Sequence, residues 1–175
     1  GKSFYPETFQ TKTHEYQWSV IAKHPYIIAS YLWNMFDFGA DGREEGGKPG
    51  QNQKGLVTFD RKIKKDAFYI YKAYLSDEPF IHLCGKRYID RTGNRTEIKV
   101  YSNQSEVTLF VDGEMINSQV GDKIFRFDIP VTGEHQISVR SGELNDTMVI
   151  RHVTEKNPDY ICPGRDVVNW FDRED

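Results

Sequence analysis

Short stretches of alternating apolar and polar residues, spaced regularly over the second half of the chain, limit the possible folds more than any other feature. Val107, Leu109 and Val111 form one such stretch, which ends at a hairpin-type turn, Asp112–Gly113. Similar stretches lie at 80–84, 97–101, 125–129, 137–139 and 148–153. A strand with one apolar face needs a second layer to cover that face. The pattern therefore predicts an antiparallel β-sandwich of immunoglobulin type over residues 77–153.

The first 76 residues mix helical and strand signals. Apolar residues recur at helical spacing up to His24, and they predict a helix that Thr13 caps and that Pro25 ends. The next segment, 26–36, is apolar almost throughout. Such a run is typical of a strand that is buried on both faces in a parallel sheet under helices.

A long glycine-rich loop over residues 39–55 follows this strand, and loops of this length are usually functional or disordered. A second helix is predicted over 64–75, with Ala67 and Ile70 on its apolar stripe. Helix, buried strand, loop and helix form a piece of α/β architecture that cannot close a sheet alone. The chain as a whole is therefore predicted to be mixed α+β, and the tail over 154–175 is predicted to be an extended connector.

The charge balance excludes several classes of partner. The formal net charge is -3, so neither nucleic acid nor an anionic membrane surface is an expected partner. No apolar run approaches the length of a membrane span. The first residues do not form a secretory signal, although a fragment would lack one in any case. The sequence therefore leaves the compartment open between periplasmic, secreted and cytoplasmic.

Cysteine and histidine usage gives no sign of a metal or redox site. Cys84 lies in an apolar run that is predicted to be a strand, which favours a buried free thiol. A disulfide between Cys84 and Cys162 is the alternative. The five histidines show no metal-ligand spacing and no partnered nucleophile, so they are interpreted as structural or surface residues. No metal and no cofactor are expected.

Several long motifs carry a resemblance to a known family. They are Trp33–Gly39 (WNMFDFG), Asp41–Arg43 (DGR), Asn52–Lys62 (NQKGLVTFDRK), Lys64–Tyr69 (KKDAFY), Ile98–Asn103 and Val107–Gly113, with shorter matches at 157–160 and 169–171. Together they resemble glycoside hydrolase family 2, which includes β-galactosidases, β-glucuronidases and β-mannosidases. These motifs are most similar to those of bacterial β-galactosidase-like members, and the resemblance covers nearly the whole chain.

The resemblance implies that residues 1–76 are the last helix–strand–helix portion of a catalytic (β/α)₈ barrel, followed by an immunoglobulin-like domain. Barrel active sites lie at the C-terminal ends of the strands, so an eighth strand at 26–38 and the loop at 39–55 would border the sugar pocket. Family members hydrolyse terminal β-linked sugars with retention, using two glutamates about 5–5.5 Å apart. Those glutamates belong to the fourth and seventh strands. This chain is therefore expected to contain no catalytic residue and to be inactive alone, with β-galactosidase the favoured activity of its parent enzyme.

Four residues are predicted to bind the carbohydrate substrate: Trp33, Asp37, Asn52 and Lys54. Trp33 would line the floor of the sugar pocket, with a core tryptophan as the alternative. Asn52 and Lys54 match a pair that binds the sugar carboxylate in the glucuronidase branch, with a solvated loop as the alternative. A similar Asn-x-Lys-Gly pattern occurs in galactosidase-like members, so the pair leaves the substrate open. Asp37 could bond sugar hydroxyls, but a hydrogen bond to a neighbouring strand end is favoured. The adjacent acids Glu44–Glu45 are interpreted as a solvated loop and not as an acid/base pair.

A non-catalytic carbohydrate-binding or interaction module is the alternative function, because β-sandwich domains often bind ligands. The barrel-like first 75 residues argue against it. Tyr88 and Tyr101 could stack on a polysaccharide, although ordinary cross-strand packing is favoured. A barrel remnant without its neighbours should expose a large apolar surface. We therefore expect the chain to form a homo-oligomer through this surface or to repack it.

Overall fold

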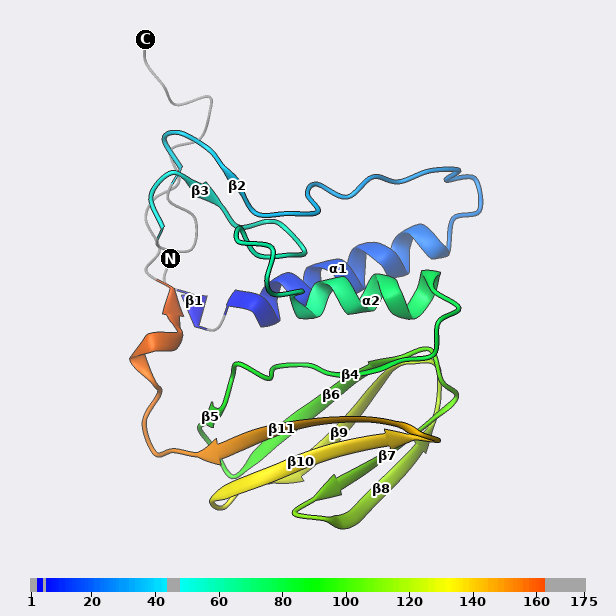
Figure 1. The fold of residues 1–175 in the computed structure, drawn as a ribbon, viewed down its shortest axis with the longest axis vertical. Helices are drawn as coiled ribbons and strands as arrows, with labels where there is room; N and C mark the ends of the chain where they lie inside the picture. Colours follow the sequence, from blue (N-terminus) through cyan, green and yellow to red (C-terminus); the bar gives the residue numbers. More distant parts are fainter. Residues whose placement is uncertain (1–2, 5, 44–47, 163–175) are drawn as a thin grey trace. The chain divides into compact units, whose positions relative to one another are not determined.

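The computed structural model describes residues 3–4, 6–43 and 48–162, and the chain divides into two compact units (Figure 1). The first unit is formed by residues 1–65 and 159–175, and the second by residues 66–158. The division falls between Lys65 and Asp66, one helix earlier than the boundary at residue 76 that the sequence suggests. Neither described helix is both long enough and apolar enough to cross a membrane.

Two sheets form most of the second unit. One has the strand order β5–β11–β10–β7–β8 and the other has the order β4–β6–β9. The strands are β4 (Ile81–Leu83), β5 (Asp90–Arg91), β6 (Arg95–Ser102), β7 (Glu106–Val111), β8 (Glu114–Val120), β9 (Lys123–Pro130), β10 (Glu134–Ser141) and β11 (Leu144–His152). Neighbours run antiparallel in both sheets, except that β5 pairs with β11 in parallel. The expectation of antiparallel sheets in this half is confirmed.

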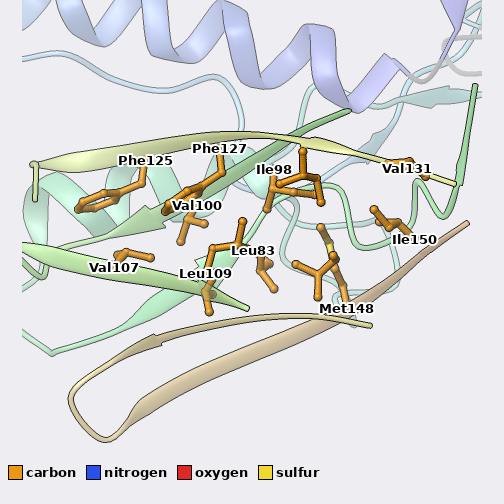
Figure 2. Packing of buried hydrophobic residues seen from close by; sticks show 13 residues of the cluster. Leu83, Ile98, Val100, Val107, Leu109, Phe125, Phe127, Val131, Met148 and Ile150 are labelled. Carbon is orange, nitrogen blue, oxygen red and sulfur yellow. The ribbon is translucent and has the colours of Figure 1, made fainter. Parts of the chain in front are cut away.

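The core of the second unit lies between these sheets, where inward-facing side chains of alternating residues meet (Figure 2). Ile98 and Val100 of β6 are fully buried, as is Leu109 of β7 in the other sheet. The cluster also contains Leu83, Val107, Phe125, Phe127, Ile129, Val131, Ile137, Val139, Met148 and Ile150. Burial of each large apolar side chain contributes about 1.5–3 kcal/mol, so this cluster is the main source of the unit's stability.

Helix α2 (Asp66–Leu75) confirms the second predicted helix, and it packs on the β4–β6–β9 sheet. Ile70 and Ala73 are buried against Cys84 and Tyr101. Because Tyr101 is fully buried there, the packing interpretation of this aromatic residue is confirmed.

The turn between β7 and β8 has the expected chemistry. Asp112 and Gly113 have φ angles of 52° and 87°, the two left-handed residues that the favoured hairpin turns require. The sequence did not predict β8. This edge strand has mostly exposed side chains, including Met115 and Val120, so burial imposes no alternation on its residues.

In the first unit, helix α1 spans Pro6–Ala22, and it ends just before Pro25 as expected. Its start differs from the prediction. Pro6 occupies the first turn, where its missing N–H costs nothing. Thr13 lies inside the helix, and its hydroxyl donates to the Phe9 carbonyl at 3.0 Å. The prediction of Thr13 as the cap is wrong, because a threonine hydroxyl can also bond to the preceding turn of its own helix.

The prediction of a buried strand at 26–36 is also wrong. Ile28 and Tyr31 are 97% and 94% exposed. In this segment the structure records one isolated parallel bridge, between Phe36 and Val57. A strand that is buried on both faces needs strands on either side and helices above and below. The described part of the first unit places no regular strand beside this segment.

Neither cysteine is in a disulfide: the Cys84 thiol is buried, as favoured, and the Cys162 thiol is half-buried. The described part of the predicted tail, residues 154–162, contains a 3₁₀ turn, η2 (Pro158–Tyr160), and a short strand, β12 (Ile161–Cys162). Strand β12 pairs antiparallel with β1 (Ser3–Phe4). The motif at 169–171 lies outside the described residues.

Candidate functional site

The long glycine-rich segment of the first unit is a hairpin. Strand β2 (Phe38–Gly39) pairs with β3 (Gln51–Asn52), so that Phe38 lies opposite Asn52. The Ala40 N–H donates to the Gly50 carbonyl at 2.9 Å and continues the pairing toward the tip. The pair Glu44–Glu45 lies outside the described residues. The two ends of the predicted loop are thus brought together next to Asp37.

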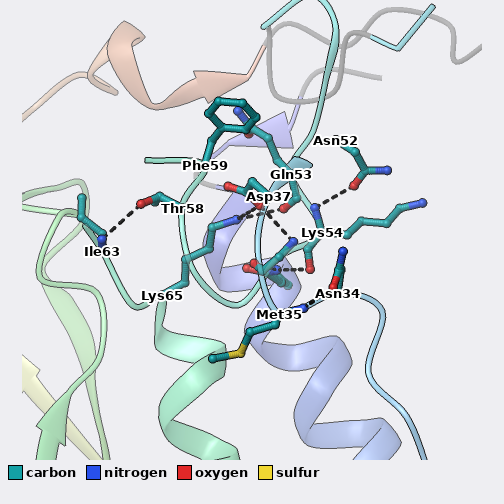
Figure 3. Close-up of polar contacts among 12 residues, drawn as sticks. Asn34, Met35, Asp37, Asn52, Gln53, Lys54, Thr58, Phe59, Ile63 and Lys65 are labelled. Carbon is teal, nitrogen blue, oxygen red and sulfur yellow. Dashed lines mark hydrogen bonds and ion pairs between the residues drawn. The ribbon is translucent and has the colours of Figure 1, made fainter. Parts of the chain in front are cut away.

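Asp37 anchors the base of this hairpin (Figure 3). Its side chain is 6% exposed, and Oδ1 accepts hydrogen bonds from the Gly55 N–H at 2.9 Å and from the Lys65 ammonium at 2.7 Å. The same ammonium donates to the Gln53 carbonyl at 2.9 Å. One carboxylate oxygen therefore ties the residue before β2 to the residues after β3, which is a structural contact of the kind favoured for Asp37.

Gly55 is required by the close approach of the two segments. A Cβ atom at this position would lie 2.1 Å from the backbone nitrogen of Asp37, a distance that no side chain tolerates. The Gln10 amide of α1 donates to the Gly55 carbonyl at 3.1 Å and to the Lys54 carbonyl at 3.2 Å. The backbone around Gly55 is thus held from two sides.

Asn52 and Lys54 are held in a fixed local geometry. Asn52 is 2% exposed, and its Oδ1 accepts the Lys54 N–H at 2.9 Å. This bond spans two residues, as in an Asx turn, so it sets the direction in which the chain leaves β3. The Lys54 side chain is exposed. A buried amide residue therefore positions an exposed lysine.

Trp33 lies on the segment that leads into β2, and its side chain is 74% exposed. Its ring meets Phe38 edge to face, with centroids 6.0 Å apart and planes at 85°. The peptide bond between Trp33 and Asn34 is cis. Since Phe38 pairs with Asn52 in the hairpin, Trp33 is linked to the Asn52–Lys54 segment through one intervening side chain.

The turn before α2 carries further polar contacts of this unit. The Thr58 hydroxyl donates to Asp60 Oδ1 at 2.6 Å, and the Lys62 N–H donates to the same oxygen at 3.2 Å. These bonds hold the pKa of Asp60 below its ordinary value. The Arg61 guanidinium lies 4.5 Å from the centre of the Phe36 ring.

The site offers binding groups: an ammonium, an exposed indole face and an organised hairpin. Asp37, Asn52 and Lys54 are brought together at the hairpin, with Trp33 one contact away. Sequence reasoning missed Gln10 and Lys65, which hold the hairpin from distant positions in the chain. Lys65 is one of several lysines before α2, and nothing in its local sequence distinguishes it from its neighbours.

Comparisons with known proteins all point to one class of enzyme. No family model matches the sequence. A beta-glucuronidase of Bacteroides fragilis is 45% identical over 120 residues, which cover 68% of this chain and 17% of that protein. The chain therefore spans about a sixth of the length of this curated relative.

Solved structures that match this chain carry the same kind of name. An FMN-binding beta-glucuronidase from Facaelibacterium prausnitzii L2-6 matches with a TM-score of 0.85 and 40% identity, over 90% of this chain and 25% of that one. A Bacteroides fragilis protein described as a "putative beta-galactosidase" matches with a TM-score of 0.80 and 44% identity, over 88% of this chain and 24% of that one. A Bacteroides uniformis beta-glucuronidase matches with a TM-score of 0.71 and 29% identity, over 83% and 19%.

These similarities define the class: the chain is homologous to a part of β-glycosidases. More particularly, the homologues carry the names β-glucuronidase and β-galactosidase. The alternative of a non-catalytic binding module is not favoured by any of these relatives.

Proposed function

We propose that this chain is part of a longer retaining β-glycosidase of glycoside hydrolase family 2 that cleaves terminal β-glucuronides. The observation that carries the substrate class is the Asn52–Lys54 segment, where a buried amide residue fixes the backbone and an exposed ammonium follows. A cation beside an amide suits the carboxylate of a glucuronic acid. A β-galactoside, which the sequence favours, is the alternative substrate.

The charge around Lys54 supports an acidic sugar. Residues 48–65 contain six basic side chains and one acidic side chain, in a chain whose net charge is -3. Lys65 is paired with Asp37 and Lys62 lies 4.0 Å from Asp60, and the residue that follows the Asn52 turn, Lys54, is exposed. Such a local excess of positive charge attracts anionic ligands over neutral ones.

The remaining roles follow the resemblance to the family. Trp33 would offer its flat apolar face to the C–H face of the sugar ring, which its exposure in the first unit supports. Asp37 would keep the hairpin in place beneath the sugar. The general acid/base and the nucleophile would be glutamates outside this chain, so the chain alone should not turn over substrate.

We also propose that the second unit is an immunoglobulin-like domain. Strands β4, β6 and β9 correspond to A, B and E of such a sandwich, and β7, β8, β10 and β11 correspond to C, C′, F and G. This order supports the assignment because an immunoglobulin sandwich divides its strands between sheets in the same way.

The test is a comparison of this chain with the longer enzyme that contains it, on chromogenic β-glucuronide, β-galactoside and β-mannoside. We expect turnover of the glucuronide by the longer enzyme and none by the chain alone. In the longer enzyme, Lys54→Ala should reduce kcat/KM for the glucuronide about 10- to 100-fold, the value of one hydrogen bond to a charged group.

Lys62→Ala is the matched control, because this lysine is 80% exposed and lies in the turn before α2. It should leave kcat/KM unchanged. Turnover of the galactoside alone, unaffected by Lys54→Ala, would replace the glucuronide with the alternative substrate. Turnover by the 175-residue chain itself would contradict the placement of the catalytic glutamates.

A further inference from the structure

Three different metal-ligand side chains meet in the second unit, away from the hairpin site. They are Asp66, His82 and Cys84, which are 6%, 7% and 6% exposed. Each offers one ligand atom, and these atoms all lie within 4.8 Å of one another. A carboxylate, an imidazole and a thiol within one buried space are an uncommon combination, because an aspartate is seldom buried without a partner.

The fold explains why the three groups converge. His82 belongs to β4, and the pairing of β4 with β6 continues at Cys84, whose N–H donates to the Lys99 carbonyl at 2.9 Å. Two strand residues separated by one position point to the same face. Asp66 is the first residue of α2, the helix that covers this face.

The contacts around the three ligands keep them in place. Asp66 Oδ2 accepts the Gly85 N–H at 2.7 Å, and Oδ1 lies 3.0 Å from His82 Nε2. The His82 ring stacks on Tyr69 with centroids 3.6 Å apart. Its other nitrogen, Nδ1, lies 3.9 Å from Asp146 Oδ2. In metal sites, the nitrogen that does not bind the metal commonly donates a hydrogen bond to a carboxylate. Asp146 lies on this side of the ring, at a distance longer than a hydrogen bond.

Asp146, the carboxylate that faces His82 Nδ1, has partners of its own. The Lys86 ammonium lies 2.6 Å from its Oδ1, and its Oδ2 accepts the Leu83 N–H at 2.7 Å. The carboxylate behind the imidazole is therefore held in place as well.

We propose that Asp66 Oδ1, His82 Nε2 and Cys84 Sγ bind one zinc ion. Oxygen, nitrogen and thiolate sulfur are the donors that zinc takes in proteins, at about 2.0–2.3 Å. On binding, the Cys84 thiol releases its proton to solvent, and the thiolate and the carboxylate then balance the two positive charges of zinc, so the complex is neutral. Calcium and magnesium do not fit, because both prefer oxygen ligands alone.

Zinc at this position would act as a staple between α2 and the β4–β6–β9 sheet. Tetrahedral zinc bonds place the ligand atoms about 3.5 Å apart. Distances near the 4.8 Å limit of this group would shorten by about an ångström, while Asp66 Oδ1 and His82 Nε2, now 3.0 Å apart, would separate slightly. The ion would replace the direct contact between Asp66 and His82, and the bond from Gly85 to Asp66 Oδ2 can stay in place. This role is independent of the substrate that the longer enzyme cleaves.

The experiment uses the full 175-residue chain after removal of metals with a chelator. Zinc is titrated by calorimetry, and cobalt is titrated by absorption, because tetrahedral cobalt with a thiolate ligand has a characteristic charge-transfer band. We expect about one ion per chain, a thiolate–cobalt band, and a higher midpoint of thermal unfolding with zinc. No binding, or binding only at millimolar metal, would overturn the proposal.

Variants identify the ligands. Cys84→Ser should abolish the charge-transfer band and weaken zinc binding at least tenfold, while Cys162→Ser, the matched control, should change neither. Circular dichroism checks that each variant is folded. If Cys84→Ser does not fold, Asp66→Asn is the second variant, since it keeps an acceptor for the Gly85 N–H and should also weaken binding. Loss of the band in Cys162→Ser alone, or full binding by both ligand variants, would overturn the site.

Discussion

At the scale of single residues, the contact between Asp37 and Lys65 determines the shape of the candidate site. Their side chains are 6% and 12% exposed, so both charges are almost completely removed from water. A buried pair of this kind contributes little relative to an apolar pair, but removal of one partner leaves a buried charge without compensation. The two charges therefore depend on each other, and the hairpin depends on both.

We expect Lys65→Ala to destabilise the first unit by about 3 kcal/mol, because it leaves the Asp37 carboxylate with the Gly55 N–H and without its counter-ion. Hydrogen exchange of the amides between residues 34 and 65 measures the local opening. Lys62→Ala, on an exposed side chain, should change this exchange little. Equal effects of the two variants would show that the buried ion pair has no special role.

Sequence reasoning found Asn52 and Lys54 because they form part of a long local motif. It could not find Lys65 and Gln10, because their partners are 28 and 45 residues away in the chain. In the sequence, the only indication of the group formed by Asp66, His82 and Cys84 is a His-x-Cys pair in a predicted strand. The third ligand comes from a helix, so the spacing resembles no familiar metal motif.

At the scale of elements, α2 is held on the sheet by the apolar side chains of one face. Ile70 is fully buried, whereas Leu75 at the end of the same helix is 69% exposed. We expect Ile70→Ala to lower the free energy of unfolding of the second unit by about 3 kcal/mol, since it leaves a cavity under the helix. Leu75→Ala should cost far less. Denaturant unfolding of the two variants measures the difference, and similar values would contradict the packing of α2 on the sheet.

Strands β5 and β11 are joined by a carboxylate whose protonation can be followed with pH. Asp90 Oδ2 accepts from the Asn157 amide at 2.7 Å, and Oδ1 accepts from the Arg151 guanidinium at 2.6 and 2.8 Å. These contacts, with Asn157 first, hold the pKa of Asp90 below its ordinary value. The folded state therefore binds the proton less readily than the unfolded state.

It follows that this stabilisation is complete above the unfolded pKa, about 3.9, and is lost as the pH falls through the lower folded pKa. Asn157→Ala should destabilise the second unit at neutral pH, and the difference from wild type should shrink in strong acid. The measurement is denaturant unfolding at a series of pH values. Asn117→Ala, on an exposed residue of β8, should show no such trend. A difference for Asn157→Ala that is constant with pH would contradict the pKa direction.

The elements differ in how well the sequence predicted them, for a physical reason. Strands β6, β7 and β9 each turn one face toward a core that is formed within this chain. The alternation of apolar and polar residues in their sequences therefore predicts them correctly. Segment 26–36 has the composition of a buried strand, but no described strand lies beside it. Its composition reflects an environment that the first unit does not supply. Strand β8 is the opposite case: it is a strand, but its side chains are mostly exposed, so its sequence has no apolar alternation from which to predict it.

At the scale of the whole molecule, the two units have unequal cores. The second unit buries two clusters of apolar side chains. Among the described residues of the first unit, only Leu56 and Val57 are fully buried apolar side chains. Local stability follows the amount of buried apolar surface, so the first unit should open more easily than the second.

The exposed apolar side chains of the first unit lead to the last prediction. Phe9, Tyr16, Tyr26, Ile28 and Tyr31 are all more than 70% exposed. Surfaces of this kind commonly mark contacts with other protein. We expect the 175-residue chain to self-associate and to bind a hydrophobic dye. Ile28→Lys combined with Tyr31→Lys should reduce both, whereas Val120→Lys, at an 83% exposed position of β8, should not. Light scattering over a range of concentrations measures the association. A monomer at all concentrations with little bound dye would mean that these side chains find cover within the chain itself.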